Sequence, residues 1–295
     1  MRSLTKVALL AGLAIAAAGA YSYYYSTPGV AQGHDATELI AIAPGEFSFY
    51  PAGDYLRDGN PVSPRPVVVR FPHELHIMKR QVSQAEYAEC VKAKACRVLD
   101  KSQRGAVSPD LPVVGISWRD ATDYAAWLTA RTGRHYRLPT YAEWVYAAGE
   151  AYEEDIIKDT SDPNDPAQRW LAEYALETQR KATGDAAPKV FGSFGANKSG
   201  MQDMGGNVWD WTDTCHTRQH VAPDGASATP LGENCGVRVV AGSHRSYISD
   251  FIRDPKGGAC SVGVPPSNLG LRLVRGAKAD TAGIGAALRD RLGIL

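Results

Sequence analysis

The apolar runs of this sequence are short, and glycine and proline interrupt them throughout. The chain has 29 glycines and 18 prolines in 295 residues, and both residue types favour turns over the interiors of helices and strands. Helical bundles need sustained apolar periodicity, which this pattern does not provide. We therefore expect a turn-rich, loop-rich structure, long enough for one large domain or two small ones with a substantial core.

The charge balance excludes one class of partner. The formal net charge is zero, and charged residues make up 22% of the chain. No basic face points to nucleic acid, and no acidic tail points to a solvating role. We expect no nucleic-acid partner.

The N-terminus has the pattern of an export signal. Arg2 and Lys6 precede Val7–Ala20, fourteen apolar or small residues without a charge. Small residues suited to cleavage lie at 18–20, and a second site lies at 30–31. Residues 1–31 are therefore predicted to be a signal peptide, which implies a periplasmic or secreted protein.

A retained membrane anchor is the alternative for the same segment. The apolar run is shorter than the roughly 20 residues of a spanning helix. Residues 7–25 can still hold the chain at a membrane, because Tyr21–Tyr25 would form an aromatic belt at its surface. The protein would then face the periplasm from the inner membrane.

Export changes the interpretation of the five cysteines, because disulfides persist in oxidising compartments. Cys90 and Cys96 lie six residues apart across a predicted helix end, and Cys215 and Cys235 bracket a predicted polar loop that contains glycine and proline. We predict these two disulfides. Cys260 is left over, either as a buried small side chain or as a reactive thiol.

Local signals place several helices and strands. Residues 40–53 predict two short strands separated by a turn at residues 44–45. Residues 150–186 lack clean periodicity and are predicted to be a long surface excursion, and residues 277–295 a C-terminal tail. Helix starts are predicted at three capping residues, with these accompanying signals: Ser83 with Glu86, Ser117 with a stop at Gly133, and Thr140 with Glu143.

The stretch GMQDMGGNVWDWTDTC, from Gly200 to Cys215, holds two of the six tryptophans, a Gly-Gly pair and three aspartates. It is too irregular for a helix and too polar for a plain buried strand. With LPVVGISWRDATDYAAWL, RLPTYAEWVYAA, RVVAGS and NLGLRLVR, in this order, it resembles the formylglycine-generating enzyme (sulfatase-modifying factor) family. The resemblance covers residues 38–276. It implies an α+β, irregular, loop-rich fold related to C-type lectins, with little regular secondary structure.

The resemblance also implies one structural calcium ion. Its ligands here would be the carboxylates of Asp203 and Asp210 and the carbonyls of Gly206 and Val208, an all-oxygen set suited to this hard cation. Trp209 and Trp211 alternate with the ligand positions, so they would face away from the ion into the core. The alternative is a tryptophan-anchored turn with its acids in solvent. No second calcium site is recognisable upstream.

Copper is not expected, although enzymes of this family bind it through two cysteines. Those positions fall on Ser246 and Phe251, or on Ser243 and Ile248 if the HRSY string sets the alignment. Cu(I) requires thiolate or thioether ligands, and this segment has none. The spacing does not favour an iron site built from histidines, because His216 and His220 fall in a predicted polar loop where a helix is not favoured.

A cluster of polar residues remains where the family has its active cleft. The candidate catalytic residues are His244, Ser246, Asp250 and Arg253. His244 could act as a base near neutral pH, and Asp250 with Arg253 could clamp an anionic or zwitterionic group. The alternative is an ordinary polar loop. Arg272 is predicted to be structural, with its guanidinium satisfying several loop carbonyls.

Two functions of different class follow. Relatives without the cysteine pair include a periplasmic oxidoreductase that matures the siderophore pyoverdine, and accessory proteins of nitrite reductase. The first expectation is therefore an exported oxidoreductase or maturation factor that acts on an exported peptide, protein or metabolite. The second is a non-catalytic, lectin-like binding module tethered at or near the membrane, since fold alone does not establish chemistry.

Overall fold

A computed structural model describes the parts of the chain that form the folded domain. The described residues are 38–99, 107–152, 167–168, 171–172, 175, 187–225, 227–242, 259–260 and 268–276. The predicted signal or anchor at 1–31, the tail at 277–295 and nearly all of the predicted excursion at 150–186 lie outside them.

Capping residues position the helices as the sequence predicts. The helices are α2 (Gln84–Lys92), α3 (Trp118–Thr132) and α4 (Tyr141–Ala148), and the 3-10 helix η2 (Gly149–Ala151) follows α4. In each α-helix the N-cap hydroxyl accepts a hydrogen bond from the third residue's amide, and that residue's carboxylate accepts one from the N-cap amide. Gly133 ends α3 in the left-handed conformation, with φ 68°.

The first sheet brings the two ends of the domain together. Its order is β1 (Leu39–Ile42), β6 (Leu75–Met78), β12 (Val274–Arg275) and β7 (Tyr136–Arg137), all antiparallel. A separate pair joins β2 (Gly45–Phe49) to β5 (Val67–Phe71). The two strands predicted around residues 44–45 are thus present, but they pair with different partners because β5 and β6 supply the matching edges.

The second sheet is built on one long hairpin. Strands β8 (Trp209–Val221) and β9 (Ala228–Ala241) pair antiparallel, with shifts of register near Cys215. Shorter strands join them in the order β10 (Ala259–Cys260), β9, β8, β3 (Asp54–Arg57) and β4 (Asn60–Pro61), and β11 (Leu269–Gly270) pairs parallel to the start of β8.

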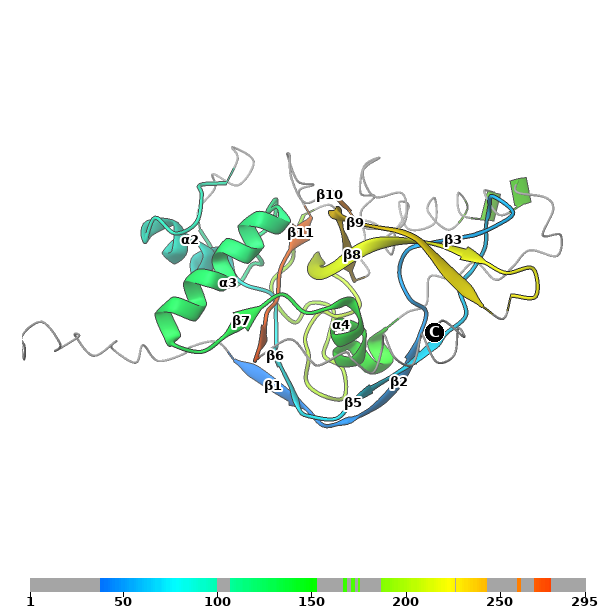
Figure 1. The fold of residues 1–295 in the computed structure, drawn as a ribbon. Helices are drawn as coiled ribbons and strands as arrows, with labels where there is room; N and C mark the ends of the chain where they lie inside the picture. The colour runs from blue at the N-terminus through cyan, green and yellow to red at the C-terminus, as the bar shows by residue number, and fades with distance from the viewer. Residues whose placement is uncertain are drawn as a thin grey trace, which may run out of the picture.

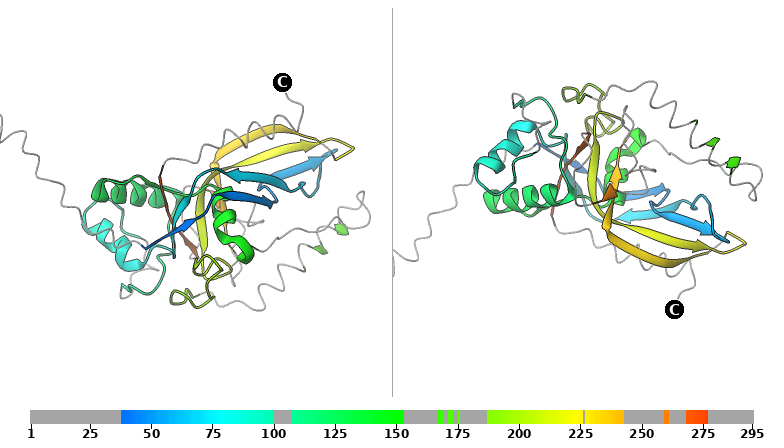
Figure 2. Two further views of the ribbon diagram at one scale, coloured as in Figure 1. Left: turned by 90° about the horizontal axis from the view of Figure 1, so that it is seen from below. Right: turned by 90° about the horizontal axis from the view of Figure 1, so that it is seen from above.

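The hairpin extends away from the helices. Figure 1 shows α2 and α3 at one end of the domain, while β3, β8 and β9 run together to the opposite end. The two further views in Figure 2 show the same arrangement. We call residues 213–238 the β8–β9 arm. The prediction of a loop between Cys215 and Cys235 was wrong: the structure shows a hairpin there, because cross-strand hydrogen bonds satisfy the backbone of residues that lack an apolar pattern.

Strand β8 enters the core between two hydrophobic clusters. Trp209 and Trp211 are buried in the cluster that includes α3, as the sequence predicts. The second cluster includes Trp144 of α4 and Ala241 of β9, which lies opposite Asp210 in the ladder. Because successive side chains of a strand point to opposite faces, Asp210 lies on the other side of β8 from the two tryptophans.

Both predicted disulfides are present. Cys90 and Cys96 are buried at the end of α2, whereas Cys215 and Cys235 join β8 to β9 near the surface. Within the part of the chain that the structure describes, no helix is both long and apolar enough to cross a membrane. The sheet-rich, loop-rich architecture with few helices confirms the predicted fold class.

Candidate functional site

The turn before β8 is built by side-chain hydrogen bonds to a neighbouring loop. The Asp203 carboxylate accepts the amides of Gly192 (Oδ2, 2.8 Å) and Phe194 (Oδ1, 2.9 Å). Asn207 accepts the amide of Lys189 at 2.9 Å and donates to its carbonyl at 3.0 Å. Asp203 and Asn207 both have left-handed backbones, with φ 57° and 70°, a conformation that Asp and Asn tolerate better than most residues. These two side chains therefore fix the path of the Gly200–Cys215 stretch.

A buried ion pair lies where β8 begins. Asp210 Oδ2 accepts hydrogen bonds from Arg272 Nε at 2.6 Å and from Trp144 Nε1 at 2.9 Å. The side chains of Asp210 and Arg272 are 1% and 0% exposed. We call Asp210, Arg272 and Trp144 the polar centre. Removing one charge of such a pair leaves the other buried and unmatched, so the three residues depend on one another.

Arg272 also ties together chain segments that form no regular ladder. Its guanidinium donates to the carbonyl of Gln202 at 3.1 Å, to that of Lys79 at 3.3 Å and to that of Met78 at 3.5 Å. The prediction that Arg272 satisfies loop carbonyls is confirmed. Its ion pair with Asp210 was not predicted, because the two residues are 62 positions apart and no local pattern links them.

These contacts bear directly on the predicted calcium ion. Both Asp203 oxygens already accept backbone amides, and the cation beside Asp210 is a guanidinium. Asp210 Oδ1 is buried without a hydrogen-bond donor among the described residues, but one such oxygen is far from the six to eight that calcium takes. The residues therefore fit the predicted ion poorly: Asp203 accepts amides of the 192–194 loop, and Asp210 accepts the side chains of Arg272 and Trp144. Calcium binding through Asp203, Asp210, Gly206 and Val208 is a prediction from the sequence alone, and the contacts in the structure lead us to expect no calcium there.

The segment with the candidate catalytic residues follows β9 in the sequence. His244, Ser246, Asp250 and Arg253 lie outside the described residues. The last described residues before them are Ala241, which pairs with Asp210, and Gly242, whose φ is 125°. The chain thus leaves β9 from a fixed, fully buried position.

The histidines considered for iron lie along a strand. His216 and His220 belong to β8 and are four positions apart, a spacing of roughly 13 Å along a strand, too far for both to bind one ion. His216 Nε2 lies 3.5 Å from Asp54 Oδ1 of β3. His216 is therefore placed to contact the neighbouring strand.

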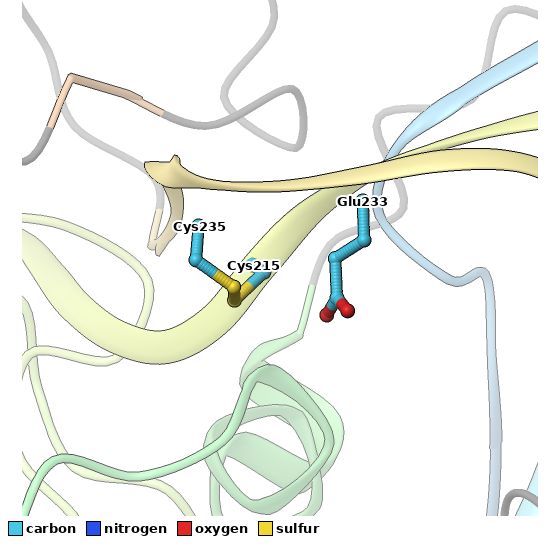
Figure 3. A group of neighbouring side chains, drawn as sticks. All are labelled: Cys215, Glu233 and Cys235. Carbon is cyan, nitrogen blue, oxygen red and sulfur yellow. A yellow bond between two sulfur atoms is a disulfide. The ribbon is translucent and has the colours of Figure 1, made fainter.

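A second cluster lies on the arm. Figure 3 shows Cys215, Cys235 and Glu233, and their sulfur and carboxylate atoms all lie within 4.8 Å of one another. The two sulfurs are bonded to each other, so they are not available as metal ligands in this form. The arm therefore carries redox-sensitive sulfur next to a carboxylate.

Arg238 connects this cluster to the body of the domain. Its guanidinium lies 4.2 Å from the centre of the Trp118 ring, donates to the carbonyl and carboxylate of Asp213 at 2.8 and 3.1 Å, and donates to the Cys235 carbonyl at 3.1 Å. Sequence reasoning did not identify this residue. Its place at the start of RVVAGS, three residues after Cys235, was the available signal.

The comparisons with known proteins agree with the geometry. Residues 25–277 match the family model of the sulfatase-modifying factor enzyme 1-like domain. The formylglycine-generating enzyme of Streptomyces coelicolor is 31% identical over 188 residues, which cover 57% of this chain and 54% of that protein. The serine/threonine-protein kinase Pkn1 of Chlamydia trachomatis is 27% identical over 262 residues, 82% of this chain and 39% of that protein. The chain thus spans about half or less of the length of these curated relatives.

Among solved structures, PvdO from Pseudomonas aeruginosa has a similar fold. The TM-score is 0.55 at 22% sequence identity, and the match covers 83% of this chain and 97% of that one. At this identity the likeness concerns the fold alone.

Proposed function

Because the chain belongs to the sulfatase-modifying factor enzyme 1-like family, we propose that it is an exported maturation factor of oxidoreductase type. Its substrate is an exported peptide, protein or metabolite, and it works without the copper-binding cysteine pair. The working residues are His244, Ser246, Asp250 and Arg253.

The observation that carries this proposal is the position from which the chain enters the segment with the candidate catalytic residues. The chain leaves β9 directly opposite Asp210, whose ion pair with Arg272 is completely buried. Catalytic groups need a rigid support to hold them in position. The polar centre provides one where the chain leaves β9, at Ala241. Neither alignment of this segment supplies a thiolate, so the proposed chemistry is not that of a copper formylglycine-generating enzyme.

Export is part of the same proposal. The two disulfides support an oxidising compartment, and residues 1–31 carry the signal pattern. Intact-mass measurement of the mature protein tests this directly. A mass that begins after residue 20 or 31 supports cleavage, whereas an unprocessed chain in the membrane fraction supports anchoring through residues 7–25.

The activity is tested with the exported peptide and protein fraction of the host. The purified protein is incubated with that fraction, and changes in substrate mass are followed by mass spectrometry. His244→Ala is expected to slow the reaction about 100-fold or more, the usual contribution of a general acid or base. Arg218→Ala, an exposed position on β8, serves as the control and should change nothing. Equal rates in the wild type and His244→Ala would contradict the proposed role of His244.

A binding module is the second candidate, and one observation favours it. Most of the distal part of β9 is exposed, including Leu231 at 58%. In addition, the chlamydial relative is named a protein kinase, and the match covers 39% of it, so there the matched region accompanies other sequence. Stable capture of an exported partner without any change in the partner's mass would favour this function over the enzyme.

A further inference from the structure

We propose that Arg57 and Arg65 form a binding site for a tetrahedral oxyanion, a phosphate or sulfate group, at the tip of the β8–β9 arm. The inference is independent of the proposed maturation activity, because the site binds an anion and carries out no reaction. The anion is either a free ion or a group carried by a larger exported molecule, and both present the same oxygens to the two guanidiniums.

The tip of the arm is the turn between β8 and β9. The Ala222 amide donates to the Ser227 carbonyl at 2.9 Å, and the Gly225 amide donates to the Ala222 carbonyl at 2.8 Å. Gly225 has φ 65°, a left-handed conformation that glycine adopts readily. Strand β3 runs beside β8 toward this tip (Figures 1 and 2). The turn therefore places a residue without a side chain close to the end of β3.

Two arginines from an earlier part of the chain converge on this turn. A Cβ atom at Gly225 would lie 3.1 Å from Arg57 Nη2 and 3.5 Å from Arg65 Nη2. Arg65 Nη2 also donates to the Asp224 carbonyl at 3.4 Å, which holds its guanidinium at the turn. Because both Nη2 atoms lie so close to one point, a single anion can accept a hydrogen bond of about 2.8 Å from each.

No carboxylate balances the two positive charges. Among the described residues, neither Arg57 nor Arg65 forms an ion pair, and Arg57 Nε is buried without a hydrogen-bond acceptor. Like charges at this separation repel each other, and a buried donor without an acceptor is costly. An anion with two charges would relieve both costs, since guanidinium groups match the geometry of phosphate and sulfate oxygens.

The backbone holds both arginines in place before any anion binds. Arg57 is the last residue of β3 and pairs with Asn60 of β4. Arg65 lies between Pro64 and Pro66, and a proline restricts both its own backbone and that of the residue before it. A site whose backbone is already ordered loses less conformational entropy on binding.

A third polar group lies on the same face of the arm. Gln219 pairs with Tyr55 in the parallel ladder, and Arg57 follows Tyr55 by two residues. The side chains of Gln219 and Arg57 therefore point to the same side of the sheet. Gln219 is 8% exposed, and its Oε1 is buried without a donor among the described residues. A side-chain amide offers an acceptor and two donors, so Gln219 is suited to a protonated phosphate or, with the amide turned, to sulfate.

Arg218 is a matched control on the same arm. It precedes Gln219 on β8, so its side chain points to the opposite face. Its Nη2 lies 3.3 Å from Asp54 Oδ2, which makes it an exposed arginine that already has a carboxylate partner. Loss of Arg218 removes one positive charge from the arm without touching the Arg57–Arg65 pair.

The first test titrates the purified full chain with sodium phosphate, and separately with sodium sulfate, by isothermal titration calorimetry at constant ionic strength. We expect one site per chain. Arg57→Ala and Arg65→Ala should each weaken binding about tenfold or more, because each removes charge-assisted hydrogen bonds. Arg218→Ala should bind like the wild type. Absence of saturable binding of both ions, or wild-type affinity in Arg57→Ala and Arg65→Ala, would overturn the proposal.

Substitutions at Gly225 isolate the role of charge. Asp and Asn have nearly the same shape, and both tolerate a left-handed backbone. In Gly225→Asp the added carboxylate would neutralise the two guanidiniums, so phosphate binding should be lost. In Gly225→Asn the added volume acts alone, and the loss should be smaller. Equal phosphate affinities in these two variants would refute a site based on the charges of Arg57 and Arg65.

Phosphoserine distinguishes the two sources of the anion, because it carries the same phosphate group on a larger molecule. Tighter binding of phosphoserine than of inorganic phosphate would identify a group on an exported molecule, and the reverse would identify the free ion. Either result supports the site only if Arg57→Ala and Arg65→Ala weaken the binding of both probes. Phosphoserine binding that is unchanged in these two variants would contradict the proposal.

Discussion

The two ends of strand β8 lie in opposite environments. At the start, Asp210 belongs to the polar centre, and both tryptophans beside it are buried. From Asp213 onward the strand forms the β8–β9 arm, where most side chains are partly or fully exposed. The comparison shows that one strand both holds the core together and presents exposed side chains whose substitution should cost little stability.

The difference follows from which groups hydrogen-bond to the backbone at each end of β8. At the start of β8 a single guanidinium serves three backbone carbonyls, so the chain segments that carry them depend on one side chain. Along most of the arm, the hydrogen bonds of the hairpin satisfy the backbone, and side chains of Arg238 and Asn234 contribute only near the disulfide. Substitutions should therefore cost much at one end and little at the other.

The largest effect is expected at Arg272. Arg272→Ala leaves Asp210 buried and unpaired and should lower the free energy of unfolding by about 3–5 kcal/mol. Chemical denaturation followed by circular dichroism measures it. Arg272→Met combined with Asp210→Leu removes both charges and should recover a large part of the loss. If Arg272→Ala cost less than Leu231→Ala, the contrast between the two ends of β8 would be wrong.

A smaller effect is expected at Asp203. Asp203→Ala removes the acceptor of two amides and should lower the free energy of unfolding by about 1–3 kcal/mol. Asp203→Asn keeps an acceptor oxygen and tolerates the left-handed backbone, so it should cost less. Equal losses in the two variants would mean that the hydrogen bonds to Gly192 and Phe194 contribute little.

The capping carboxylate Glu86 gives an effect that depends on pH. Burial raises the pKa of Glu86, but hydrogen bonds and charge from Arg80 and the Ser83 amide outweigh burial and hold the pKa below its usual value. Because the folded-state pKa is lowered, the stabilisation is fully present above the unfolded pKa of about 4.3 and is lost as the pH falls through the folded pKa.

Glu86→Gln should therefore lower the free energy of unfolding by about 1–2 kcal/mol at neutral pH. Denaturation curves of the two proteins should converge as the pH falls below about 4. A difference that stays constant across this range would show that the charge of Glu86 is not what stabilises α2.

On the arm, Leu231→Ala should change the free energy of unfolding by less than about 0.5 kcal/mol, because the side chain is 58% exposed. Thermal unfolding of the two proteins provides the measurement. A loss above about 1 kcal/mol would mean that the arm is covered, for example by a partner or a second copy.

No effect is expected from removing calcium. Since Arg272 already supplies the cation beside Asp210, EDTA should leave the melting temperature unchanged. Elemental analysis of protein purified without chelator accompanies this measurement. One calcium per chain, with a lower melting temperature in EDTA, would establish the calcium site instead.

Local signals in the sequence predicted the features that depend on neighbouring residues. The three helix starts, the two disulfides and the burial of Trp209 and Trp211 followed from spacing and alternation. The partners of Asp210 did not, because Arg272 and Trp144 are 62 and 66 residues away. The length of the hairpin was missed as well, since an arm exposed over much of its surface has no apolar alternation to reveal it.

The position of β12 has a consequence for how the protein folds. Residues 274–275 pair with β6 on one side and β7 on the other, so the last described strand lies inside a sheet whose edge strands are β1 and β7. The sheet cannot be completed until this late part of the chain has left the ribosome. The strand pairings of β12 also join residues that are far apart in sequence. Such long-range contacts slow folding. The domain should therefore fold slowly and only after synthesis has passed residue 275, and a truncation before β12 should leave an open chain that proteases degrade.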